Sequence, residues 1–197
     1  MKKRIAGLTS NILSPFSVIL ILVILLSFTA ASSLLDAIKW ALISVGLSIL
    51  PVFLVIAYLV QNGKLNAIFI TAREKRTKIY LLAVLCAAVS YAALNYLRAP
   101  PILVATFAAG LSTAVIFAGI NLWWKVSIHT ALVAGSVTLL IMLYGWILAV
   151  TTVLIPLMAW ARIESNNHSP AQAVAGALLA ALIVVVVFMV FYPFLLV

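Results

Sequence analysis

The sequence predicts an all-α fold, a polytopic transmembrane helical bundle with six to seven spans. Of its 197 residues, 67% are hydrophobic and only 8% are charged, far more apolar surface than a soluble domain of this size needs. The apolar runs are continuous rather than alternating, which favours helices over the strands of a β-barrel. We therefore expect a single transmembrane domain covering residues 1–197.

In the N-terminal third, the sequence predicts two membrane spans that follow a short basic segment. Residues 1–13 are polar and carry Lys2, Lys3 and Arg4, as the start of a signal peptide does. The apolar run that follows, residues 14–31, is long enough to cross a membrane and lacks a convincing cleavage site, so it is interpreted as an uncleaved first span. A short turn separates it from a second span, residues 38–59.

The middle of the chain predicts two further spans beyond its longest polar segment, residues 60–78. The third span is residues 79–96. It ends before Pro100 and Pro101, because paired prolines cannot continue a helix. The fourth span is residues 102–122.

A stretch of 32 largely apolar residues, 130–161, is too long for one crossing. As a single helix it would measure about 48 Å, against a hydrocarbon core of about 30 Å. We place a break at Tyr144-Gly145, which gives spans over residues 130–144 and 146–161. The last span is residues 171–195.

The basic residues predict the orientation and the partners. With seven spans, ten of the twelve Lys and Arg residues fall on the side of the N-terminus, which the positive-inside rule makes cytoplasmic. In so apolar a chain, the net charge of +9 indicates anionic lipid headgroups rather than nucleic acid. The single Cys86 excludes an internal disulfide.

Both histidines of the chain, His129 and His168, fall on that same predicted side. Ser169-Pro170 is a favourable helix start, which places His168 at a helix N-terminus where backbone N–H groups favour an anion. Gln172 follows His168 by four residues and shares its helix face.

The residue pattern also separates the possible chemistries. Metal binding is disfavoured because no metal-ligand spacing is present, and serine hydrolase chemistry is disfavoured because no Gly-x-Ser-x-Gly elbow is present. Two histidines among cations favour phosphoryl transfer without a metal or other cofactor.

The spacing Arg162-x5-His168-x3-Gln172, with Gly176 shortly after, resembles the last signature of the type 2 phosphatidic acid phosphatase and vanadium haloperoxidase superfamily, Ser-Arg-x5-His-x3-Asp. Residues 125–129, Lys-Val-Ser-Ile-His, resemble its middle signature, Pro-Ser-Gly-His. Residues 73–76, Arg-Glu-Lys-Arg, are a weaker match to the first, Lys-x6-Arg-Pro. The resemblance covers roughly residues 60–180, and divergent short prokaryotic members share the Trp-Lys-x-Ser-x-His and His-x-x-x-Gln pattern.

The resemblance implies a role for each matched residue. His168 corresponds to the nucleophile that forms a phospho-histidine, and His129 to the general acid on the leaving alcohol. The remaining positions correspond to phosphate-binding groups or stand close to them: Arg162, Ser127, Lys125, and Arg73 or Arg76. Gln172 replaces the Asp that orients the nucleophile. A neutral amide can fix the imidazole tautomer, but it does not stabilise a developing imidazolium as a carboxylate does.

The implied function is hydrolysis of a lipid phosphomonoester or diphosphate, of the phosphatidic acid or polyprenyl phosphate class, at a prokaryotic inner or plasma membrane. The alternative is a catalytically lapsed homologue that binds lipid or scaffolds a membrane complex. Simpler explanations exist for single features. The histidines can be ordinary interfacial residues, Arg162 can snorkel, and the cations of residues 73–78 can serve topology alone.

Overall fold

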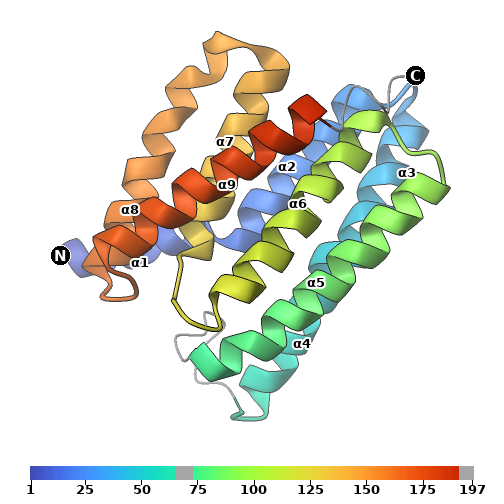
Figure 1. Cartoon of the computed structure of the whole chain (residues 1–197). Coiled ribbons are helices and arrows are strands. Elements are labelled where there is room, and N and C mark those ends of the chain that lie inside the picture. Colours follow the sequence, from blue (N-terminus) through green and yellow to red (C-terminus); the bar gives the residue numbers. More distant parts are fainter. Residues whose placement is uncertain (65–72, 191–197) are drawn as a thin grey trace. The chain divides into compact units, whose positions relative to one another are not determined.

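The computed structural model describes residues 1–64 and 73–190, and the side chains of residues 73–76 are not among the described parts. The described chain is helical, as the sequence predicts (Figure 1). Within these described residues, six helical stretches are long and apolar enough to cross a membrane, and a shorter apolar helix, Ile128–Tyr144, is the seventh. The protein is therefore an integral membrane protein. Two compact units are distinguished by their internal contacts, the first formed by Met1–Ile19 with the chain from Lys125 onward, the second by Leu20–Trp124.

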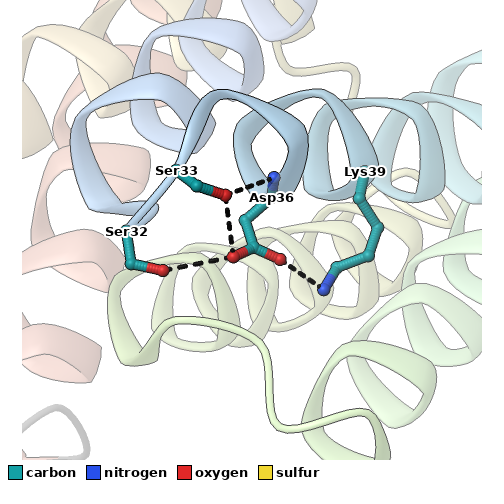
Figure 2. A network of polar contacts seen from close by, with 4 residues as sticks. All are labelled: Ser32, Ser33, Asp36 and Lys39. Atoms are coloured by element: carbon teal, nitrogen blue, oxygen red, sulfur yellow. Dashed lines mark hydrogen bonds and ion pairs between the residues drawn. The ribbon is translucent and has the colours of Figure 1, made fainter.

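The second unit holds most of the N-terminal half of the chain. Its elements are α2 (Pro15–Ala30, which begins in the first unit), α3 (Leu34–Ser44), the π-helical turn η1 (Val45–Ile49), α4 (Leu50–Gln61), α5 (Arg73–Tyr96) and α6 (Pro101–Ile120). Figure 2 shows how α3 begins: the Ser33 hydroxyl accepts the backbone N–H of Asp36 at 3.1 Å. The Asp36 carboxylate in turn accepts from Lys39 at 2.7 Å. An acid in the first turn also complements the helix dipole, which stabilises this start.

A proline interrupts the second span, which runs over Leu34–Gln61 and is longer than the predicted 38–59. Pro51 lacks an N–H group, and its ring would clash with the carbonyl of the residue four positions earlier. The π-helical turn η1 lies immediately before it and widens the backbone there. The Ser48 hydroxyl donates to the carbonyl of Ser44 at 2.6 Å within this turn.

The predicted break at the paired prolines is confirmed. α5 ends at Tyr96, Arg98 takes a positive φ of 54°, and Pro101 opens α6. α5 and α6 pack against each other, and near their other ends Asn121 Nδ2 donates to the hydroxyl of Thr77 at 3.2 Å. The two helices thus form an antiparallel pair, and the turn between them is determined by residues that are close together in the sequence.

The first unit consists of α1 (Lys2–Ile12), the start of α2, α7 (Ile128–Tyr144), the 3₁₀ helix η2 (Trp146–Val153), α8 (Leu154–Glu164) and α9 (Pro170–Val190). α7 packs along α9, and α8 contacts both (Figure 1). The core joins Val133 and Val137 of α7 to Met158 of α8. The predicted break at Tyr144-Gly145 is confirmed, since α7 ends at Tyr144 and Gly145 takes a φ of 83° that side chains disfavour.

The basic lead-in forms a helix of its own, α1, which packs against α8. It ends at Ile12 because Ser14 and Pro15 begin the next helix. The Ser14 hydroxyl accepts the N–H of Ser17 at 3.2 Å, and Pro15 occupies the first position of α2. The first span is therefore preceded by a separate helical segment rather than by an irregular tail.

Candidate functional site

The first turn of α9 is a capping box. The backbone N–H of Gln172 donates to the Ser169 hydroxyl at 3.3 Å, and the Ser169 N–H donates back to Gln172 Oε1 at 3.2 Å. Ser at the cap with Gln three residues later satisfies two N–H groups that a helix start otherwise leaves without partners. The predicted helix start at Ser169-Pro170 is confirmed.

The same amide oxygen holds the ring of His168. His168 Nδ1 lies 3.1 Å from Gln172 Oε1. Because Oε1 already accepts the Ser169 N–H, the amide orientation is set, and an oxygen can only accept. Nδ1 therefore carries the proton, which leaves Nε2 as the unprotonated nitrogen of the neutral ring.

The loop between α8 and α9 ties His168 to Arg162. The Arg162 carbonyl accepts the N–H groups of Asn167, at 3.1 Å, and of His168, at 3.3 Å. Asn166 makes the tight turn possible by adopting a positive φ of 55°, which asparagine tolerates better than most residues. Arg162 lies in the last turn of α8 and its side chain is buried. A guanidinium at this depth attracts an anion more strongly than it would in water.

The start of α7 packs against the start of α9. Ser127 caps α7, its hydroxyl accepting the Thr130 N–H at 3.4 Å, and its own N–H donates to the carbonyl of Gln172 at 3.2 Å. The Thr130 hydroxyl reaches the carbonyl of Ala173 at 3.0 Å. Gly176 allows this approach, because a Cβ there would meet the Ser127 oxygen at 2.6 Å. Two helix N-termini are thus brought side by side.

The remaining residues predicted from positions 125–129 lie at the same end of the first unit. His129 is the second residue of α7 and is buried, as is its Nε2 atom. Lys125 Nζ donates to the carbonyl of Asn167 at 2.7 Å, which joins the segment before α7 to the loop before α9. The structure therefore gathers six of the predicted residues at one end of the unit: Lys125, Ser127, His129, Arg162, His168 and Gln172.

The structure does not test the predicted roles of Arg73 and Arg76. Both belong to the start of α5 in the second unit, and their side chains lie outside the described parts of the chain. Two contributors were missed by sequence reasoning. Thr130 stands three residues after Ser127, a spacing that signals a helix cap, whereas nothing in the sequence marks Asn167 as a partner of Lys125.

Comparisons with family models, with curated proteins and with solved structures found no match to this chain. Within residues 1–64 and 73–190, no group of three or more His, Cys, Asp or Glu side chains is arranged to hold a metal ion.

Proposed function

We propose that this protein is an integral-membrane phosphatase that hydrolyses a phosphomonoester or diphosphate of a lipid, of the phosphatidic acid or polyprenyl phosphate class. The observation that carries the proposal is the pair His168 Nδ1 and Gln172 Oε1, 3.1 Å apart at a helix N-terminus. It presents an imidazole whose second nitrogen is unprotonated and can attack phosphorus.

The reaction proceeds in two displacements. In the first, His168 Nε2 forms a bond to phosphorus while the bond from phosphorus to the lipid oxygen breaks, and His129 protonates that leaving oxygen. In the second, water attacks the phospho-histidine, the phosphorus–nitrogen bond breaks, and its electron pair returns to Nε2. His129 accepts the proton of the attacking water. Gln172 keeps the proton of His168 on Nδ1 throughout.

Phosphate binding is supported by the electrostatics of the site. The positive ends of α7 and α9 lie together, and backbone N–H groups at helix N-termini favour anions. Arg162 adds a buried positive charge, and Lys125 lies close by through its bond to the loop. Charge that develops on the phosphoryl oxygens is stabilised best by such groups that are already in place. The superfamily resemblance adds a further phosphate-binding cation, Arg73 or Arg76.

The order of the motifs also supports the proposal. Residues 125–129 and 162–172 resemble the middle and last signatures of the type 2 phosphatidic acid phosphatase superfamily, and the contacts between them follow from two crossings, α7 and η2 with α8. The site would then lie at the cytoplasmic surface, where most of the basic residues are expected.

The second candidate function is a catalytically lapsed homologue that binds a lipid phosphate without hydrolysing it. One observation favours it: Gln172 forms a capping box with Ser169, a structural role that does not depend on catalysis. An Asp in its place would argue for catalysis more strongly, because a carboxylate stabilises the imidazolium.

The experiment is phosphate release from a panel of lipid phosphates and diphosphates by the purified protein in detergent. We expect turnover by the wild type, a loss of at least a thousandfold in His168→Ala, and wild-type turnover in Thr152→Ala, whose exposed residue lies in η2. An acid-labile phosphoryl group should be trapped on the wild type alone. Binding of these lipids without release of phosphate by the wild type would establish the lapsed homologue instead.

A further inference from the structure

Helix α1 has three distinct faces. Ala6 and Ser10 are buried on the face that packs against α8. A second face is apolar and exposed, formed by Met1, Ile5, Leu8 and Ile12, with exposed fractions of 47% for Ile5 and 70% for Ile12. At 3.6 residues per turn these four fall within an arc of about 60°. Arg4, Gly7 and Asn11 lie on the third face, between the other two.

The charge on this segment is of one sign. Lys2, Lys3 and Arg4 are all exposed, and the first acidic residue of the chain is Asp36. Segments with an apolar stripe and a basic flank lie in the plane of a membrane surface, where the stripe enters the acyl region and the cations meet lipid phosphates. A continuous span would bring the side chains of Thr9 and Asn11, which are not buried in the protein, into hydrocarbon as well.

The break between α1 and α2 permits a change of direction. α1 ends at Ile12, the backbone of Leu13 leaves the helical region, and Ser14 and Pro15 begin a new helix. α2 itself has 16 residues, about 24 Å, and with the non-helical Ser14 and Ala31 at its ends the segment reaches the lower limit of about 17 residues for a crossing. α2 with its flanking residues can therefore cross the bilayer while α1 lies at the surface.

We propose that α1 is an interfacial anchor for anionic lipid, with Met1, Ile5, Leu8 and Ile12 in the acyl region and Lys2, Lys3 and Arg4 on headgroup phosphates. Because α1 packs on α8, the anchor fixes the depth of the helix that carries Arg162. It enriches negatively charged lipid beside that helix. This role does not depend on whether His168 is a nucleophile.

The test compares neighbouring positions on the full-length protein in nanodiscs of phosphatidylglycerol and phosphatidylcholine. Single cysteines are placed at Arg4, Ile5, Asn11 and Ile12, all exposed, in a Cys86→Ala background and labelled with an environment-sensitive fluorophore. If α1 lies in the plane, the labels at 5 and 12 are equally deep and those at 4 and 11 equally shallow. If α1 extends the span, labels at adjacent positions differ in depth by only about 1.5 Å, and the labels at 5 and 12 differ in depth by about 10 Å.

Quenching by nitroxide-labelled lipid reports both depth and lipid type. We expect the label at Ile12 to be quenched at least twofold more by nitroxide phosphatidylglycerol than by nitroxide phosphatidylcholine at equal content. The excess should vanish when Lys2, Lys3 and Arg4 are all changed to Gln. The proposal would be overturned by a label depth that changes steadily from position 4 to position 12. Equal quenching by both lipids in the protein labelled at position 12 that keeps Lys2, Lys3 and Arg4 would also overturn it. Neither outcome bears on phosphate release.

Discussion

The role of Gln172 can be tested with two substitutions that differ in one respect. Its Oε1 atom accepts two hydrogen bonds, from the Ser169 N–H at 3.2 Å and from His168 Nδ1 at 3.1 Å. Gln172→Ala removes both. Gln172→Glu has nearly the same shape and keeps an oxygen that can accept both hydrogen bonds, while it adds a negative charge at the start of α9. The pair therefore separates the geometry of the amide from the charge of a carboxylate.

The expected magnitudes follow from these two bonds. Loss of the capping interaction in Gln172→Ala should cost about 0.5–1 kcal/mol of stability, because N-terminal caps contribute about this much. Loss of the bond that orients His168 should lower kcat about ten- to a hundredfold, the usual effect of removing an outer partner of a reactive imidazole. That corresponds to about 1.4–2.7 kcal/mol in the activation barrier.

Gln172→Glu should be as stable as the wild type or slightly more so, since an acid in the first helical turn is favourable. Its kcat should equal or exceed that of the wild type, because a carboxylate stabilises the positive charge that the imidazole ring gains as Nε2 bonds to phosphorus. The same charge favours protonated His168 in the free enzyme. The acid limb of the pH–rate profile should therefore move to higher pH, since activity requires the unprotonated Nε2.

The assay is phosphate release from one lipid phosphate between pH 5 and pH 9, paired with thermal unfolding of each variant in the same detergent. Wild-type kcat in Gln172→Ala, together with a lowered unfolding temperature, would show that Gln172 serves the helix cap alone. An unmoved acid limb in Gln172→Glu would show that His168 does not act as the nucleophile.

Three further predictions concern the metal, the packing and the topology. EDTA should leave phosphate release unchanged and vanadate should inhibit it; inhibition by EDTA that Mg²⁺ reverses would contradict the mechanism. Gly176→Ala should destabilise the protein by about 1–3 kcal/mol in thermal unfolding, since its Cβ would meet the backbone of Ser127 at 2.6 Å. Gly119→Ala should leave stability within about 1 kcal/mol, because no atom of the described chain outside its own helical turn lies within 4 Å of the added Cβ. In a cysteine-free background, single cysteines at Trp123 and Asn166 should react with an impermeant thiol reagent from one side of the membrane and a cysteine at Trp146 from the other. Reaction of Asn166 and Trp146 from the same side would refute the two crossings.

The sequence by itself determined the fold class and most of the breaks between helices. These breaks depend on local chemistry that one or two residues carry: a proline without an N–H group at Pro101, a left-handed backbone at Gly145, and a cap at Ser169. The membrane class follows from composition, because apolar runs of this length have no other stable environment. The proximity of His168 and Gln172 was also predictable, since four residues on a helix bring side chains together.

Only the tertiary structure decided which of these local features meet. Lys125 and Asn167 are 42 positions apart, and Thr130 and Ala173 are 43 apart, so no helical periodicity relates them. Their contacts depend on how closely α7 and α9 can approach, and this is set by the missing side chain at Gly176. The helical form of residues 2–12 was likewise not foreseen, because their polar composition signals a lead-in, whereas packing on α8 stabilises a helix too short to persist alone.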